Sequence, residues 1–347
     1  MLAVIYHGPG DLRVEERPEP APAPDNLIVQ VRCCAICGTD VKLATVGNPR
    51  FRPPRIIGHE MVGHIVHGGA QVRGFACGER ITLATTLACG TCVYCALGLG
   101  NLCPNAKPIS ADFDGVFAKY LAVPALALAG GNVIKVPPEV SDEEAALCEP
   151  LSCALNAQQL AGVREGDRVL IVGGGPLGVL HALLARALGA CDCMITQRSE
   201  PRLSMLRNLP GVTAIAAADV DVAQAVRERT RGLGADVVIV CAPSREPQEQ
   251  ALSLARKGGT VSMFASLPKG ASDITIDSRL LHYNELRLVG ASDSRPEHVS
   301  QAVQMMAEGR IDVRPAVTHR VRLADALQGI KLMLDKQSLK VLVYPDP

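Results

Sequence analysis

The middle of the chain alternates between short apolar runs with strand character and longer segments with helical periodicity. Residues 168–172 read RVLIV, a β-branched run of the kind that a buried parallel strand requires. Residues 177–188 follow with apolar positions three and four apart, which predicts a helix. Further apolar runs at 235–243, 258–266 and 286–294 mostly come after helical stretches. This alternation predicts an α/β fold with a doubly wound parallel sheet.

The turn between the first of these strands and its helix is rich in glycine. Gly173, Gly175 and Gly178 have the G-x-G-x-x-G spacing, with Pro176 and Leu177 inside the motif. Because the motif follows a strand and opens a helix, it has the context of a dinucleotide fingerprint, in which backbone amides at the helix N-terminus bind the pyrophosphate. We predict that these five residues bind a nicotinamide dinucleotide.

The end of the next strand bears on the choice between NAD and NADP. An NAD site has an acidic residue about 20 positions after the motif, and Gln197 stands at that place. Arg198, Ser199 and Arg202 offer guanidinium groups and a hydroxyl that suit a 2′-phosphate. We therefore predict that NADP is preferred. In the alternative, both arginines are solvated at a helix start and Glu200 takes the acidic role.

A second dense motif, ACGTCVYCALGLGNLCP at residues 88–104, contains four cysteines, and no Lys or Arg lies between them. Cys89, Cys92, Cys95 and Cys103 have the spacing C-x2-C-x2-C-x7-C, which favours a tetrahedral zinc ion. Four thiolates leave no open coordination position, so we expect a structural zinc. The alternatives are buried thiols without a metal and a nucleic-acid-binding zinc ribbon, which would usually carry basic residues.

Three separate segments carry candidate ligands for a second metal ion. Cys37 lies in CGTD, His59 and Glu60 lie in GHE, and Glu149 lies in EPLS. A thiolate, an imidazole and one or two carboxylates are typical of a catalytic zinc that keeps one position for water or a substrate oxygen. Taken alone, each segment would be read as ordinary core or surface packing.

Two residues beside Cys37 have candidate supporting roles. We expect Asp40 to accept a hydrogen bond from the non-ligating nitrogen of His59, although it could instead stabilise the turn. Thr39 is placed to pass the proton of a substrate hydroxyl outward. Its alternative role is to cap a helix that begins near residue 40.

Composition and charge narrow the classes of partner. The 347 residues include 35 basic and 35 acidic side chains, which disfavours nucleic acid or an anionic membrane as the main partner. There are 13 cysteines, and the first residues lack the pattern of a secretion signal, so reduced thiols are expected rather than a disulfide framework. No apolar run reaches the roughly 18 residues of a membrane span. We expect a cytoplasmic protein.

With these motifs placed, the chain resembles the zinc-containing medium-chain dehydrogenase/reductase family over essentially its whole length. The residues that carry the resemblance are CGTD at 37–40, GHE at 58–60, the cysteine lobe at 89–103 and GGGPLG at 173–178. Zinc-free quinone reductases of the wider family lack such a lobe.

The resemblance implies a domain organisation and an assembly. It implies a GroES-like, β-rich catalytic domain over 1–154 with a zinc lobe at 86–104, a Rossmann NAD(P)-binding domain over 155–292, and a C-terminal return to the catalytic domain over 293–347. It also implies a homodimer or homotetramer.

Within the family, the sequence looks like the sorbitol (polyol) and threonine dehydrogenase branch. Glu149 stands where liver-type alcohol dehydrogenases have a cysteine, and residues 280–292 also resemble this branch. The resemblance leaves open whether Glu60 or Glu149 binds zinc directly. Cys148 and Cys153 are expected to be packing residues, with Cys148 as an alternative ligand.

One position departs from the family pattern. Lys42 stands where the family commonly has a histidine that relays the proton to solvent. Its ammonium could contact the nicotinamide ribose and carry the proton, or the relay could bypass it.

The combined interpretation is a zinc-dependent oxidoreductase. It would transfer a hydride between a secondary alcohol, polyol or sugar-like, and NAD(P), with zinc lowering the pKa of the substrate hydroxyl. Alternatives with the same chemistry are a cyclitol, aminocyclitol or threonine-type dehydrogenase. An alternative of another class is a non-enzymatic NADP(H)-binding regulatory protein.

Overall fold

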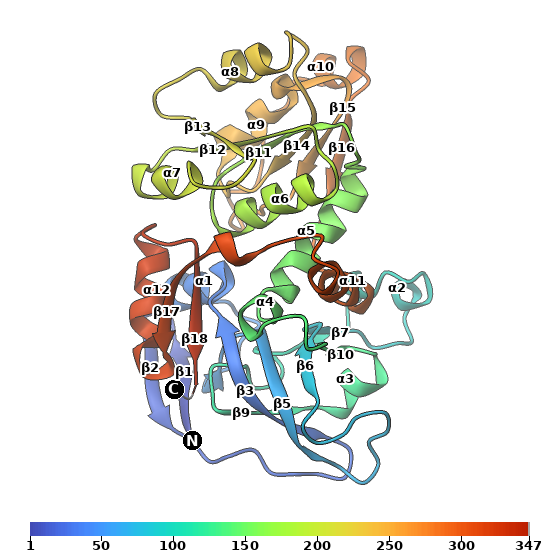
Figure 1. Ribbon diagram of the computed structural model, residues 1–347, viewed down its shortest axis with the longest axis vertical. Coiled ribbons are helices and arrows are strands. Elements are labelled where there is room, and N and C mark those ends of the chain that lie inside the picture. Colours follow the sequence, from blue (N-terminus) through green and yellow to red (C-terminus); the bar gives the residue numbers. More distant parts are fainter. Residues whose placement is uncertain (346–347) are drawn as a thin grey trace. The chain divides into compact units, whose positions relative to one another are not determined.

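The computed structural model describes residues 1–345, which divide into two compact units (Figure 1). The first unit comprises residues 1–152 together with the segment from Asp293 onward, and the second comprises Cys153–Ser292. Helix α5 (Cys148–Ala161) begins in the first unit and continues into the second. Among the described residues, no helix is long and apolar enough to cross a lipid bilayer.

The second unit is built on a parallel sheet of six strands in the order β13-β12-β11-β14-β15-β16. The neighbours of β11 are β12 and β14, so the strand order reverses there, which is the point where α/β sheets bind ligands at the carboxyl ends of their strands. The strands are β11 (Arg168–Val172), β12 (Asp192–Gln197), β13 (Thr213–Ala216), β14 (Ala235–Val240), β15 (Ala255–Met263) and β16 (Arg287–Gly290).

Helices connect successive strands of this sheet. Helix α6 packs against β11 and β12, and helix α9 packs against β14 and β15. Both helices present buried apolar residues to the sheet, as the sequence periodicity predicts. The helices of this unit, besides the part of α5 that it contains, are α6 (Pro176–Ala187), α7 (Glu200–Leu206), α8 (Val222–Arg229), α9 (Arg245–Leu254) and α10 (Ser278–Tyr283).

The α/β fold class that the sequence predicts is confirmed, with small differences at strand ends. The run predicted at 258–266 corresponds to β15, which begins three residues earlier because Ala255 pairs with Ala235 across an irregularity in the ladder. The run predicted at 286–294 is a strand only over β16, and the chain leaves the sheet at residue 291.

The first unit is rich in short strands. The largest sheet has the order β10-β6-β5-β3-β18-β17, with β9 also pairing β3, and the smaller sheets are β2-β1-β4 and β7-β8. The strands are β1 (Leu2–Gly8), β2 (Asp11–Glu16), β3 (Leu27–Ala35), β4 (Arg55–Ile56), β5 (Glu60–Gly68), β6 (Arg80–Leu83), β7 (Thr86–Leu87), β8 (Lys107–Pro108), β9 (Tyr120–Val123), β10 (Val133–Lys135), β17 (Val317–Arg322) and β18 (Lys340–Tyr344).

Short helices join these strands. The α-helices are α1 (Gly38–Val46), α2 (Val93–Ala96), α3 (Ala125–Ala129), α4 (Asp142–Ala145), α11 (Pro296–Ala307) and α12 (Ala326–Leu334), and the 3-10 turns are η1 (Gly100–Leu102), η2 (Arg314–Ala316) and η3 (Leu323–Asp325).

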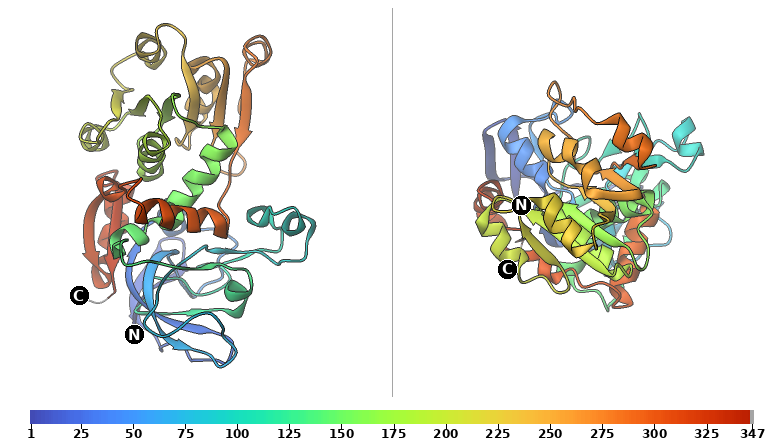
Figure 2. Two further views of the ribbon diagram at one scale, coloured as in Figure 1. Left: turned by 45° about the vertical axis from the view of Figure 1, so that its right-hand side comes forward. Right: turned by 90° about the horizontal axis from the view of Figure 1, so that it is seen from above.

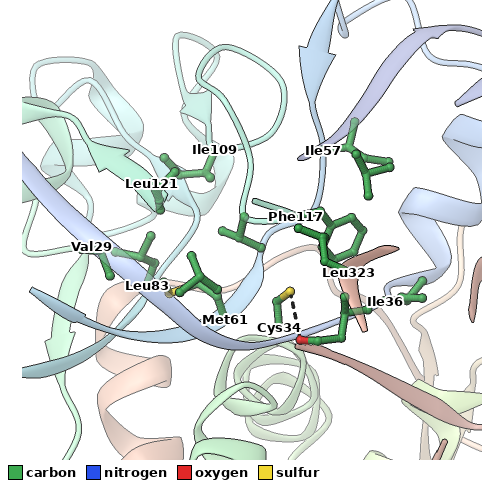
Figure 3. Close-up of a cluster of buried hydrophobic side chains, with 14 of the residues drawn as sticks. Val29, Cys34, Ile36, Ile57, Met61, Leu83, Ile109, Phe117, Leu121 and Leu323 are labelled. Carbon is green, nitrogen blue, oxygen red and sulfur yellow. Dashed lines mark hydrogen bonds between the residues drawn. The ribbon is translucent and has the colours of Figure 1, made fainter. Parts of the chain in front are cut away.

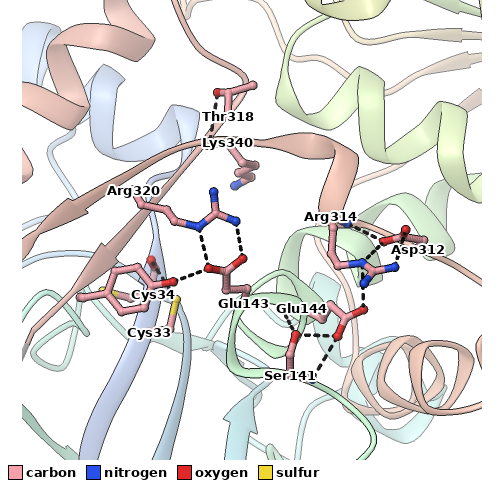
Figure 4. A network of polar contacts seen from close by, with 11 residues as sticks. Cys33, Cys34, Ser141, Glu143, Glu144, Asp312, Arg314, Thr318, Arg320 and Lys340 are labelled. Carbon is pink, nitrogen blue, oxygen red and sulfur yellow. Dashed lines mark hydrogen bonds and ion pairs between the residues drawn. The ribbon is translucent and has the colours of Figure 1, made fainter. Parts of the chain in front are cut away.

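The C-terminal segment completes the largest sheet of the first unit (Figure 2). Strand β18 runs antiparallel to β3, with Val343 opposite Cys34, and parallel to β17. Polar contacts also hold this segment to α4. The Arg320 guanidinium donates two hydrogen bonds of 2.6 Å to the carboxylate of Glu143, which also accepts one from Tyr344 (Figure 4).

The core of this unit contains buried side chains from residues 4–133 and from the C-terminal segment 323–343 (Figure 3). Phe117 is fully buried there, among residues that include Ile57 and Met61. Its ring lies against Gly58, whose φ is 89°; a Cβ at Gly58 would stand 2.6 Å from the ring. Only glycine fits this turn, and the turn places the next residue, His59, at the entrance of β5.

We predict that Gly58→Ala destabilises the protein by about 2–5 kcal/mol. This is the sum of the cost of a left-handed backbone conformation at a residue with a Cβ and the cost of overpacking the core. The measurement is urea unfolding followed by circular dichroism. Gly74→Ala is the matched control, because Gly74 has φ 81° but no atom within 4 Å of an added Cβ. Equal losses in the two variants would contradict the packing explanation.

Candidate active site and metal centres

Strand register brings the predicted catalytic residues together. In the antiparallel pair of β3 and β5, Ala35 lies opposite Glu60. The residues that follow β3 and those that precede β5 therefore meet at one edge of the sheet. Cys37, two residues beyond Ala35, immediately precedes helix α1, and His59 immediately precedes β5.

Three of the four predicted ligands form one cluster. One donor atom each from Cys37, His59 and Glu60 lies within 4.8 Å of the others. Cys37 and His59 are partly exposed, whereas Glu60 is fully buried. A thiolate, an imidazole and a carboxylate at this separation suit a tetrahedral zinc ion, with one position left for an exchangeable ligand.

Glu149 is the fourth predicted ligand, and it lies in the first turn of α5. Its side chain is 6% exposed, and it interacts electrostatically with both His59 and Glu60. Burial raises the pKa of Glu149 to about 7, and the nearby carboxylates of Glu60 and Asp293 act in the same direction. The structure thus places it near the cluster, while Glu60 is the carboxylate that groups with Cys37 and His59.

Asp40 is buried beside the cluster and stabilises the turn that carries Cys37. Its Oδ2 accepts a hydrogen bond of 2.9 Å from the backbone N–H of Cys37. Its Oδ1 lies 3.9 Å from Nδ1 of His59, which is longer than a hydrogen bond. Of the two roles considered from the sequence, the turn-stabilising one is formed directly, and the contact with His59 is electrostatic.

Lys340 is a residue of this site that the sequence motifs did not reveal. It is the first residue of β18, and its side chain is fully buried. Its ammonium donates to both carboxylate oxygens of Glu60 and, at 3.3 Å, to the carbonyl of Ile36. The pairing of β18 with β3 brings it here from 280 residues beyond Glu60, so no local signal could have indicated it.

The electrostatics of the cluster favour a cation. Burial alone lowers the pKa of His59, but the Cys37 thiolate and the carboxylates of Asp40 and Glu149 raise it well above its ordinary value. Negative groups that hold a proton on an imidazole in a buried site also attract a divalent ion, which displaces that proton. The donor set therefore fits the zinc ion that the sequence predicts.

Thr39 and Lys42 both lie on α1 and are exposed. Cys37 is the N-cap of this helix, so Thr39 stands within its first turn and is not the capping residue. The capping alternative for Thr39 is therefore wrong. Both side chains face solvent, as groups that transfer a proton outward must.

The four cysteines of the lobe form the second candidate metal centre. The Sγ atoms of Cys89, Cys92, Cys95 and Cys103 all lie within 4.8 Å of one another. The Sγ–Sγ separations include 3.5 Å between Cys92 and Cys95 and 3.7 Å between Cys92 and Cys103. Four sulfurs at 2.3 Å from a tetrahedral zinc are about 3.8 Å apart, so the cluster has the dimensions of a closed structural site.

Two thiols of this lobe have pKa values that are shifted in opposite directions. Hydrogen bonds from the backbone and hydroxyl of Thr91 lower the pKa of Cys89 to about 5. Burial and the neighbouring thiol of Cys92 raise the pKa of Cys95 to about 11. A bound zinc ion would displace the remaining protons, which couples its affinity to pH.

The glycine-rich turn of the second unit lies directly before helix α6, as a dinucleotide fingerprint requires. Helix α6 begins at Pro176, directly after Gly175, so its first backbone amides face the turn. A Cβ at Gly178 would stand 2.0 Å from the carbonyl oxygen of Gly173, so only glycine allows the helix to pack this closely. Leu177 is partly buried in the first turn of α6.

The predicted 2′-phosphate residues follow β12. A Cβ at Gly174 would lie 3.3 Å from the Cβ of Gln197, so the turn and the end of β12 are in contact. Arg202 lies beside the turn, with Nη1 3.7 Å from the Cβ position of Gly175. The Arg198 guanidinium is 2.6 Å from the carboxylate of Glu246 at the start of α9, an exposed ion pair that the sequence did not indicate.

Ser199 adds an unsatisfied polar atom to this corner. Its Oγ is buried and has no hydrogen-bond partner among residues 1–345. A buried hydroxyl without a partner is costly, and a phosphate oxygen would satisfy it.

Comparisons with known proteins agree with this arrangement. The alcohol dehydrogenase GroES-like domain matches residues 23–138, and the zinc-binding dehydrogenase domain matches residues 176–308. The chain is 32% identical to a sorbitol dehydrogenase from Halalkalibacterium halodurans, over 99% of this chain and 98% of the relative. It is 31% identical to an L-threonine 3-dehydrogenase from Pyrococcus horikoshii, with the same coverage.

A solved structure from Sinorhizobium meliloti 1021, described as a zinc-binding dehydrogenase bound to NADP, superposes with a TM-score of 0.90 at 33% identity and covers 99% of both chains. The protein therefore belongs to the zinc-binding medium-chain alcohol dehydrogenase family. It is a zinc-dependent NAD(P) enzyme of the alcohol and polyol dehydrogenase type. The alternative of a non-enzymatic regulatory protein is set aside.

We predict that Cys103→Ser lowers the zinc content from about two ions per chain to about one and lowers the melting temperature, because a closed four-sulfur site contributes folding free energy. Inductively coupled plasma mass spectrometry and calorimetry measure the two effects. Cys77→Ser is the control, since Cys77 is exposed and outside both clusters. Full zinc retention in Cys103→Ser would contradict a metal at the lobe.

Proposed function

We propose that the protein reversibly oxidises a secondary alcohol of polyol or sugar type to the ketone, with NADP preferred over NAD. The observation that carries this proposal is the cluster of Cys37, His59 and Glu60, whose donor atoms suit one zinc ion with an open position. The sorbitol dehydrogenase among the relatives supports a polyol.

We assign the metal ligands as follows. Cys37, His59 and Glu60 hold the catalytic zinc, with Glu149 as the further carboxylate of the same site, and the four lobe cysteines hold the structural zinc. A bound zinc ion supplies a Lewis acid that makes an alcohol hydroxyl more acidic. Asp40 keeps Cys37 at the turn through the hydrogen bond to its backbone N–H.

Proton and cofactor handling fall to other residues. Thr39 accepts the substrate proton, and Lys42 or water carries it outward from the exposed surface of α1. A bound nicotinamide dinucleotide accepts or supplies the hydride. The amides of the glycine-rich turn hold its pyrophosphate and thereby orient it.

The preference for NADP is supported by the corner after β12. Gln197 leaves no carboxylate at the position that would bind ribose hydroxyls. Arg198, which pairs with Glu246, and Ser199, with its buried hydroxyl, follow it directly, and Arg202 lies beside the glycine-rich turn. The Sinorhizobium meliloti relative was solved with NADP.

A threonine-type reaction is the second candidate, because the threonine dehydrogenase relative matches almost as well as the sorbitol dehydrogenase. Cyclitols and aminocyclitols share the same secondary-alcohol chemistry. A panel of polyols, cyclitols and L-threonine, assayed with both cofactors, separates these substrates.

We also propose that the protein forms a homodimer or homotetramer and is located in the cytoplasm. The family resemblance supports the homo-oligomer. Sedimentation velocity measures the number of chains in it directly. None of the cysteines among residues 1–345 is paired in a disulfide, which suits a reducing compartment.

We predict that His59→Ala lowers kcat/KM by about a thousandfold or more, since one ligand of the catalytic metal is lost, while NADP binding in the other unit is retained. Turnover and the fluorescence of bound NADPH measure the two effects. His67→Ala is the control, because His67 lies on the same strand β5 but is exposed. Activity in His59→Ala close to that of the parent would refute the metal role.

We predict that kcat/KM is higher with NADP than with NAD, and that Arg198→Ala lowers the NADP value about tenfold while the NAD value changes less than about twofold, since only NADP loses a charge-assisted hydrogen bond. Arg207→Ala, which removes a nearby exposed arginine paired with Glu200, serves as the control. A higher kcat/KM with NAD in the unmodified protein would overturn the preference.

A further inference from the structure

The Glu60–Lys340 ion pair is buried completely within the first unit. Both side chains have 0% exposure, and the ammonium contacts both carboxylate oxygens. A lysine has three N–H donors, and here two go to Glu60 and the third to the carbonyl of Ile36. The three donors of the lysine are thus satisfied by these two partners, and in this structure both side chains are shielded from solvent.

The same carboxylate also belongs to the metal cluster, since an oxygen of Glu60 lies within 4.8 Å of the donor atoms of Cys37 and His59. A metal ion held by this cluster would therefore share Glu60 with the ammonium. Withdrawing Glu60 from Lys340 would leave a buried ammonium without a counter-ion, which is strongly unfavourable.

The charges at the site also favour keeping Glu60 paired with Lys340. The site gathers the Cys37 sulfur and the carboxyl groups of Asp40, Glu60 and Glu149, and burial raises the pKa of both Asp40 and Glu149. The fixed cation of Lys340 offsets the negative charge of Glu60, so that charge is already balanced before a divalent ion binds. The ammonium draws electron density from Glu60, which makes that carboxylate a weaker metal ligand than one without such a partner.

We propose that Lys340 is a positioning residue of the metal site, which shares the Glu60 carboxylate with the metal and so keeps Glu60 a weak, exchangeable ligand. Glu60 then yields readily to a substrate oxygen or to Glu149, without leaving a charge unpaired. This inference rests on the metal site assigned under the proposed function.

The experiment measures zinc release from the zinc-loaded protein into excess 4-(2-pyridylazo)resorcinol, followed by absorbance. Cys37→Ser identifies the kinetic phase that belongs to this site, because that phase is absent in the variant. If Cys37→Ser keeps both phases, the metal-site assignment itself is wrong. If the phase disappears, the lysine variants test the inference alone.

We expect Lys340→Met to slow this phase about tenfold or more, because Glu60 becomes a full ligand and a positive charge next to the metal is removed. Lys340→Gln, which keeps a hydrogen-bond donor, should slow it about threefold or more. Lys340→Arg, which keeps the charge, should release zinc at close to the parent rate. Glu60→Gln should release it faster.

Lys135→Met is the matched control, since Lys135 forms an exposed ion pair of 2.6 Å with Glu79 in the same unit. A merely structural lysine predicts faster or unchanged release in Lys340→Met and Lys340→Gln, because a loosened fold does not hold its metal more tightly. Faster or unchanged release overturns the proposal. Failure of both Lys340→Met and Lys340→Gln to fold also overturns it, because the lysine would then be required for folding alone.

Discussion

The catalytic unit depends on the neutralisation of negative charge inside an apolar β-rich core. Asp40 and Glu60 are at most 1% exposed, Glu149 is 6% exposed, and the Cys37 sulfur lies beside them. In a medium of low dielectric constant such a group of acids is stable only when its members are protonated or have cations close by. Lys340 supplies one positive charge permanently, and a bound zinc ion would supply two more. Removing one partner of a buried pair of this kind costs about 3–5 kcal/mol, so metal binding and folding are linked here.

The parts of the site that the sequence predicts are those whose residues lie close together along the chain. The lobe cysteines lie within 15 residues, and their spacing alone indicates a closed tetrahedral site, which the sulfur positions match. The glycine-rich turn is likewise local, because strand, turn and helix follow one another directly. For Cys37, His59 and Glu60 the motifs indicate ligand types, and the register of β3 against β5 then brings them together.

The interactions that the sequence did not indicate are those between distant segments. Lys340 meets Glu60 from 280 residues away, and only the pairing of β18 with β3 establishes that contact. Glu246 meets Arg198 from 48 residues away, because β14 and β12 flank β11 and place the start of α9 near the end of β12. A single lysine in an apolar strand has no spacing pattern, so its role becomes visible only when the sheet is assembled.

The central claim is that one ion binds Cys37, His59 and a neighbouring carboxylate and retains room for a reacting oxygen. Anomalous diffraction at the zinc edge from crystals of the zinc-loaded protein tests it most directly. We predict two peaks per chain, one surrounded by four sulfurs and one bound by a sulfur, an imidazole nitrogen and a carboxylate oxygen, with a position open to solvent. A single peak at the cysteine lobe, or a second ion closed off by protein ligands on every side, would contradict it.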